Sequence, residues 1–119
     1  MKRSFLFTIF FISSTFLIGQ SDSKKKFLVN TIAFYNVENL FDTINDPKTW
    51  DDDRTPKGRD RWTSVIYENK LKNIAKVIAE IGFDLTNQAP SVIGLCEIEN
   101  RRVLEDLIKT ESLIKENYK

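Results

Sequence analysis

The sequence contains no histidine and only one cysteine, Cys96. Histidine is the side chain used most often as a general acid or base and as a ligand for transition metals, so neither role can fall to it here. A single cysteine also excludes a disulfide bond within the chain. Any complete catalytic site would therefore have to use carboxylates, lysine, tyrosine or a metal-bound water.

The chain also lacks a strong charge of either sign. Its 119 residues carry a net charge of +1, although 29% of them are charged. This balance gives no sign of the basic surface that is typical of nucleic-acid-binding domains. The length allows one small domain, and a hydrophobic share of 41% is ordinary for a globular protein.

The first segment has the order of residues that is typical of an export signal. Lys2 and Arg3 precede a nearly uninterrupted apolar stretch, residues 5–18, and small and polar residues follow it. We predict a signal peptide over residues 1–20 and a polar linker over residues 21–26. A transmembrane anchor is the alternative, but the stretch is shorter than the roughly 18–20 residues that a membrane span needs. We therefore expect an exported protein, periplasmic or extracellular, with no stable membrane anchor after cleavage.

The remaining chain predicts an α/β (α+β) fold. Residues 27–35 are rich in β-branched and aromatic side chains and predict a buried strand, and residues 91–96 predict a second one. Residues 37–61 are rich in aspartate and proline and predict a long loop, a feature that is often functional. Asn100 could cap a second helix that runs through Ile108.

The helix between the two predicted strands has the clearest pattern. Thr63 or Ser64 could cap its start, and Gly82 could close its end. Its apolar residues recur at spacings of four and three, which places them on one face: Tyr67, Leu71, Ile74, Ile78 and Ile81. We therefore expect this helix to connect two parallel strands as a crossover.

Polar residues follow both predicted strands. Asn36 comes directly after the first strand, and Glu97 comes directly after the second. Neighbouring parallel strands end at the same edge of a sheet, and in open α/β sheets ligands bind at that carboxyl edge. We therefore expect Asn36 and Glu97 to lie side by side at a ligand-binding edge.

Each of these residues has two interpretations. Glu97 could bind a hard cation, because Mg²⁺ takes one or two protein carboxylates together with water and phosphate oxygens, or it could be a solvent-facing residue that opens the next helix. Asn36 could orient a phosphate oxygen, although an asparagine after a strand more often bonds its own backbone. Further polar residues could join this cluster or be loop surface: Glu38, Asn39, Asp42 and Glu99.

Other residues have plainer interpretations. Cys96 lies in an apolar run without a histidine to activate it, so we expect a buried, inert thiol. The aspartates at residues 51–53 lack the spacing and the central glycine of an EF-hand, so we expect a solvated acidic turn. Trp50 and Trp62 lie on either side of this turn and are expected to pin it to the domain.

Two segments resemble the opening motifs of the endonuclease/exonuclease/phosphatase family, whose fold is that of deoxyribonuclease I. They are residues 34–42 (FYNVENLFD) and residues 91–100 (SVIGLCEIEN). The resemblance implies a two-sheet α/β sandwich and a divalent-metal-dependent hydrolysis of phosphodiester or phosphomonoester bonds. It further implies that Asn36 lies in the active site and that Glu97 binds Mg²⁺, with Mn²⁺ or Ca²⁺ as alternatives.

Later motifs of that family are missing from the chain. It has neither the Asp-x-Asn pair nor the terminal Ser-Asp-His motif. We therefore expect residues 27–119 to be the N-terminal part of such a domain and to be inactive alone. Nucleic acid, inositol phosphates and lipid head groups are all substrates within this family, and the sequence does not choose among them. The alternative is a non-catalytic module that binds nucleic acid or a phosphorylated ligand.

Overall fold

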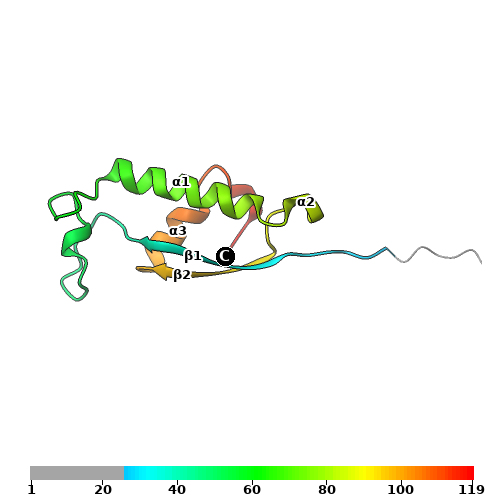
Figure 1. The fold of residues 1–119 in the computed structure, drawn as a ribbon, viewed down its shortest axis with the longest axis horizontal. Helices are drawn as coiled ribbons and strands as arrows, with labels where there is room; N and C mark the ends of the chain where they lie inside the picture. Colours follow the sequence, from blue (N-terminus) through cyan, green and yellow to red (C-terminus); the bar gives the residue numbers. More distant parts are fainter. Residues whose placement is uncertain (1–25) are drawn as a thin grey trace, which may run out of the picture.

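A computed structural model describes residues 26–119, so the predicted signal peptide and residues 21–25 of the linker lie outside the described part. The described residues form a mixed α/β fold (Figure 1). Its elements are β1 (Ile32–Leu40), the 3₁₀ helix η1 (Asp52–Arg54), α1 (Ser64–Glu80), α2 (Phe83–Thr86), β2 (Val92–Ile98), α3 (Arg101–Ile108) and the 3₁₀ helix η2 (Ile114–Glu116). None of the helices in this part of the chain has the length and apolar character needed to cross a membrane.

The two strands pair in parallel, as the predicted crossover requires. The register pairs Ile32 with Val92 near the start of the sheet and Asn36 with Cys96 near its carboxyl edge. Figure 1 shows α1 lying along the sheet, with α3 on the same side. Both strands therefore end at one edge, next to the long loop that leads from β1 to α1.

The central helix α1 begins and ends where its sequence predicts. Thr63 is the N-cap, and its hydroxyl accepts a hydrogen bond from the Ile66 N–H at 3.4 Å. Gly82 follows the helix with a φ of +71°, a left-handed conformation that glycine adopts without the steric cost of a Cβ. A Cβ at this position would lie 2.4 Å from the Thr31 hydroxyl, so the turn requires glycine.

The core lies between α1, α3 and one face of the sheet. Its members are Val37, Leu40, Tyr67, Leu71, Ile74, Ala75, Ile78, Val103, Leu107 and Leu113. The predicted apolar stripe of α1 is therefore confirmed, except that its last residue, Ile81, is half-buried. Full burial of a leucine or isoleucine side chain stabilises a fold by about 1.5–3 kcal/mol, so this face of α1 accounts for much of the helix's stability.

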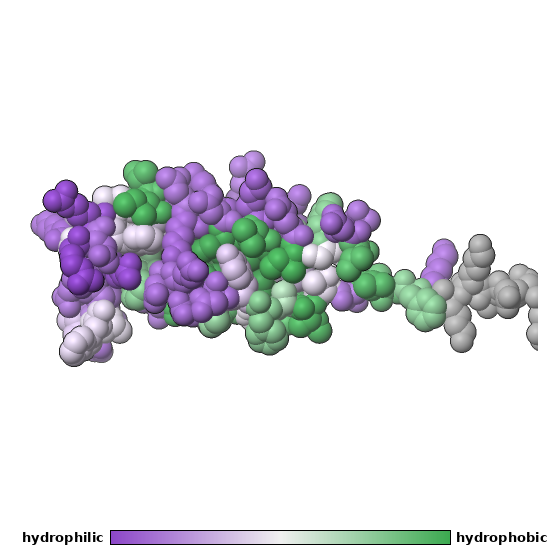
Figure 2. Space-filling view, in the orientation of Figure 1, coloured by the Kyte–Doolittle hydropathy of each residue, from purple (hydrophilic) through white to green (hydrophobic). Residues whose placement is uncertain are grey.

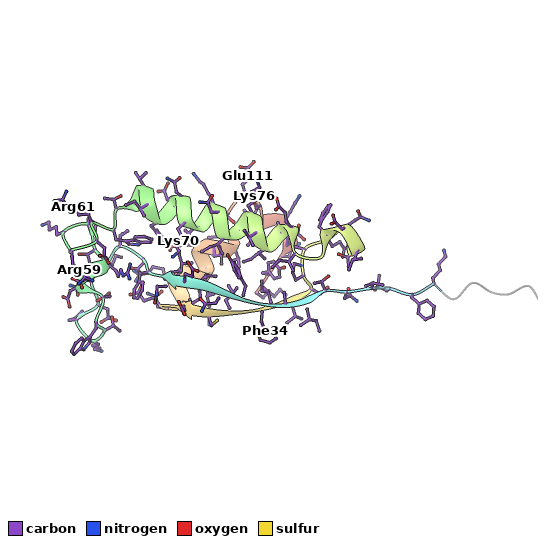
Figure 3. The ribbon with its side chains drawn as sticks, viewed as in Figure 1. Phe34, Arg59, Arg61, Lys70, Lys76 and Glu111 are labelled. Carbon is purple, nitrogen blue, oxygen red and sulfur yellow. The ribbon has the colours of Figure 1, made fainter. Side chains whose placement is uncertain are left out.

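The opposite face of the sheet is open in the described part of the chain. Ile32, Phe34 and Val92 are 70%, 88% and 57% exposed, and Figure 3 shows Phe34 pointing away from α1. Figure 2 shows hydrophobic residues along this underside of the molecule. Cys96 is also exposed, so the prediction of a buried thiol is wrong. The apolar run around Cys96 resembles a covered strand, but α1 and α3 cover one face only.

The strand boundaries differ from the predicted ones. β1 begins at Ile32 rather than at residue 27 and continues past Asn36 to Leu40. β2 likewise extends to Ile98. A strand lasts as long as its partner offers hydrogen bonds, and this pairing was not visible in the composition of either run. The connection from α1 to β2 contains the short helix α2.

The long loop between β1 and α1 is held at its two ends. The Trp62 Nε1 donates a hydrogen bond to the Phe41 carbonyl at 3.0 Å, so Trp62 pins the loop as predicted. Trp50 is fully exposed and therefore does not pin the loop. Figure 2 shows hydrophilic residues gathered at this end of the molecule. The prediction of a solvated turn at residues 51–53 is nevertheless wrong in part, because Asp51 is only 2% exposed.

Candidate metal and phosphate site

The two polar residues at the carboxyl edge of the sheet lie in direct contact. Asn36 is paired with Cys96, and Glu97 is the next residue of β2. The Asn36 Nδ2 donates a hydrogen bond to the Glu97 Oε1 at 2.6 Å. Both side chains are exposed, so a ligand from solvent could reach their polar atoms.

The amide of Asn36 is held in one orientation. Its Oδ1 accepts a hydrogen bond from the Glu38 N–H at 2.8 Å, while its Nδ2 faces Glu97. A carboxamide nitrogen carries two N–H donors, and the contact with Glu97 uses one of them. Asn36 therefore bonds its own backbone, as one of its two interpretations predicts, and it also faces the Glu97 carboxylate.

The backbone around this pair is unusual. Residues 37–39, which we call the β1 bulge, interrupt the register of the sheet and lie opposite Glu97. Glu38, Asn39 and Glu97 have φ values of +56°, +59° and +61°. A left-handed conformation costs a non-glycine residue roughly 1–2 kcal/mol, and such residues cluster at functional sites. The surrounding contacts must therefore hold this backbone in place.

A lysine from α1 supplies such contacts. The Lys70 Nζ donates hydrogen bonds to the carbonyl oxygens of Glu38 and Asn39, the second at 3.3 Å. It also lies 5.7 Å from the centre of the Trp62 ring. Burial lowers the pKa of Lys70, whereas the charges of Glu38 and Glu97 act to raise it. The Lys70 ammonium group thus lies close enough to Glu97 for the two charges to interact.

A second group of contacts joins the end of β1 to the start of α3. The Asp42 carboxylate, in a residue that is 5% exposed, accepts from the Asn100 Nδ2 at 3.2 Å and from the Arg102 guanidinium at 3.3 Å. The Asp42 N–H donates to the Glu99 carboxylate at 2.8 Å. Asn100 is also the N-cap of α3, through the Val103 N–H at 3.1 Å, as its sequence predicts.

Asp51 brings the long loop against this second group. One of its oxygens accepts from the Asp46 N–H at 2.9 Å, while its buried Oδ1 has no hydrogen-bond partner in residues 26–119. The Asp46 N–H holds the pKa of Asp51 below its ordinary value. Burial raises the pKa of Glu99, and the nearby carboxylates of Asp42 and Asp51 raise it further, against the opposing effect of the Asp42 N–H.

The sequence agrees with a known family over the region that holds all of these contacts. A model described as the endonuclease/exonuclease/phosphatase family matches residues 31–119. The chain belongs to the endonuclease/exonuclease/phosphatase family. This is a family of phosphoesterases and nucleases whose members generally use divalent metals. Comparison with curated proteins and with solved structures found no match.

The exposed Asn36–Glu97 pair suits the hard divalent cations that this family uses. Mg²⁺ usually takes one or two protein carboxylates and completes its octahedron with water and substrate phosphate oxygens. One exposed carboxylate fits that ligand set. Within residues 26–119 no group of three or more His, Cys, Asp or Glu side chains is arranged to hold a metal ion. A cation bound beside Glu97 would therefore have to take most of its ligands from water or substrate rather than from the described residues.

The structure divides the predicted site residues of this family member into two sets. Asn36 and Glu97 are in contact, and Glu38 and Asn39 lie beside them in the β1 bulge. The other two predicted residues, Asp42 and Glu99, bond to each other, and Asp42 also bonds to the start of α3.

Lys70 was not predicted to be a site residue, although its position in the helical pattern carries a signal. Lys70 lies three residues after Tyr67 and four before Ile74, and this spacing puts it on the buried face of α1. A lysine on that face needs a partner inside the fold, and the β1 bulge provides one. Arg102 carried no comparable signal, because its contact with Asp42 spans most of the described chain.

Proposed function

We propose that the Asn36–Glu97 pair is part of the active site of a divalent-metal-dependent phosphoesterase, a nuclease or phosphatase. The contact of an amide with a carboxylate at 2.6 Å, at the carboxyl edge of a parallel sheet, is the observation that supports this proposal. Glu97 binds the cation, for which Mg²⁺ is the first candidate and Mn²⁺ or Ca²⁺ the alternatives. Asn36 directs its second amide N–H at a phosphate oxygen.

The two side chains have separate tasks in this proposal. Mg²⁺, when bound, would neutralise the charge that develops on the phosphate oxygens as water attacks phosphorus. Glu97 supplies a carboxylate with one oxygen held by Asn36. Asn36 keeps its donors turned toward the site because the Glu38 N–H fixes its Oδ1. The backbone of Glu97 has a φ of +61°, outside the extended range of the strand, and its side chain reaches the Asn36 amide.

We expect the 119-residue chain to be inactive by itself. Hydrolysis in this family also relies on aspartate and histidine groups that activate water and protonate the leaving group, and this chain has no histidine. With bis-p-nitrophenyl phosphate and Mg²⁺, the purified chain should give no rate above the uncatalysed background. A Mg²⁺-dependent rate that EDTA removes would contradict this expectation.

We further propose that a second sheet packs against the open face of β1 and β2, as in a two-sheet sandwich. The exposed side chains of Ile32, Phe34 and Val92 support this, since neighbouring exposed apolar side chains on one face of a sheet often mark an interface. Export and a phosphate-ester substrate stay predictions from the sequence, with nucleic acid among the candidates.

The metal part of the proposal can be tested by mapping Mn²⁺ on the chain. Paramagnetic Mn²⁺ at substoichiometric concentration should broaden the amide signals of residues 96–98 and the side-chain NH₂ signal of Asn36 before any others. Excess Mg²⁺ should restore these signals, because both ions prefer oxygen ligands. Broadening that begins at the acidic loop, residues 51–53, would contradict the proposal. Inorganic phosphate binding at Asn36 without any metal would instead support a non-catalytic binding module.

A further inference from the structure

The carbonyl groups of the β1 bulge need hydrogen-bond partners from outside the sheet. Its residues 37–39 lie where the pairing with β2 is interrupted, so their carbonyl oxygens cannot all use the strand ladder. Glu38 and Asn39 also adopt left-handed conformations, which asparagine tolerates better than glutamate does. A backbone of this kind persists only if other groups hold it.

Two side chains from outside the strand hold it. Lys70 of α1 donates to the Glu38 and Asn39 carbonyls, and Trp62 donates to the Phe41 carbonyl at 3.0 Å. The Lys70 ammonium also lies 5.7 Å from the Trp62 ring centre, within range of a cation–π interaction. Figure 3 shows Lys70 between α1 and the carboxyl end of β1. The brace therefore runs from α1 to the carbonyls of the second and third residues after Asn36.

The brace acts on the candidate site through the backbone of one residue, Glu38. The Glu38 N–H is the donor that fixes the Asn36 Oδ1, and the Glu38 carbonyl is held by Lys70. If the Glu38 peptide units rotate, the Asn36 amide loses its fixed orientation. Its Nδ2 then no longer faces the Glu97 carboxylate in a single geometry.

We infer that Lys70 is a positioning residue: by holding the Glu38 and Asn39 carbonyls it fixes the orientation of Asn36 and Glu97 toward a bound cation. This inference rests on the proposed function in so far as Glu97 binds a cation. Lys70 does not itself touch the cation, since its two described hydrogen bonds point at the backbone.

The direction in which cation affinity changes distinguishes a positioning role of Lys70 from a purely electrostatic one. Lys70→Met keeps the apolar stem and removes the charge and the donors. Loss of a nearby positive charge alone would strengthen cation binding at Glu97. Loss of positioning would weaken it, by about 10-fold, which is the smaller end of what outer partners of metal ligands contribute. Lys70→Arg, which keeps charge and donors, should restore most of the affinity.

The experiment has two readouts. The first is the Mn²⁺ affinity, measured from the broadening of the amide signals of residues 96–98. The second is the chemical shifts of the Asn36 side-chain NH₂ group in the absence of metal. Lys72→Met, on the exposed face of α1, is the matched control and should match the wild type in both. Lys70→Met should weaken Mn²⁺ binding and move the Asn36 NH₂ signals toward those of a free amide. Unchanged or tighter binding with unchanged Asn36 signals would overturn the inference, even if the melting temperature falls. Failure of Glu97 to bind Mn²⁺ in the wild type would defeat the proposed function instead, and the metal-free Asn36 signals would still test the brace.

Discussion

Replacing Glu97 with glutamine should abolish divalent-cation binding at the sheet edge while the fold stays intact. Glutamine keeps the shape of the side chain, and its Oε1 can still accept the hydrogen bond from the Asn36 Nδ2. It loses the negative charge that a hard cation requires. We expect affinity to fall by roughly 100-fold or more, because the loss of an outer partner alone costs 10–100-fold. Titration with Mn²⁺, followed by broadening at residues 96–98, measures the change.

Thermal unfolding provides the internal check on this variant. Glu97 is exposed and makes no core contact, so Glu97→Gln should unfold within a degree or two of the wild type. Glu68→Gln removes one carboxylate from the exposed face of α1 and is the matched control, with wild-type Mn²⁺ affinity expected. A Glu97→Gln chain that binds Mn²⁺ as tightly as the wild type would remove the metal role from this residue.

Much of the local structure could be predicted because the signals are local. The stripe of α1, its Thr63 cap, the Asn100 cap of α3 and the closing Gly82 all depend on residues within a turn or two of one another. The ends of the strands could not be predicted in the same way. They depend on which residues of β1 and β2 meet, and these are separated by about sixty positions in the chain.

The candidate site follows the same division. Asn36 and Glu97 were predictable as neighbours because parallel strands bring their ends together whatever the details of the register. The β1 bulge was not predictable, because no glycine marks its left-handed residues Glu38 and Asn39. The hydrogen bonds of Lys70 to this bulge could not be predicted for the same reason.

Substituting Asp42 with alanine should cause the largest loss of stability among the polar residues of the described chain. The substitution would leave three donors without their acceptor: the Ile44 N–H at 2.7 Å, the Asn100 Nδ2 and the Arg102 guanidinium. A partly buried donor left without its acceptor costs about 1–3 kcal/mol, and two such donors remain, whereas the Arg102 guanidinium adds little because its side chain is 57% exposed and can be rehydrated. Urea unfolding should therefore report a loss of about 3 kcal/mol.

Two variants show whether this loss belongs to Asp42 rather than to acidic residues in general. Asp53→Ala removes an exposed partner of Arg59 and should change stability by less than about 0.5 kcal/mol. Glu99→Gln keeps an acceptor for the Asp42 N–H and adds an amide donor near Asp51, whose Oδ1 has no partner within residues 26–119, so it should be at least as stable as the wild type at pH 7. Because the folded-state pKa of Glu99 is raised, its ionisation opposes folding as the pH rises past its ordinary value, and Glu99→Gln should remove that part of the pH dependence. An Asp42→Ala chain within 1 kcal/mol of Asp53→Ala would mean that the donors of Asn100 and Arg102 find water instead, and that the buried carboxylate does not tie β1 to α3.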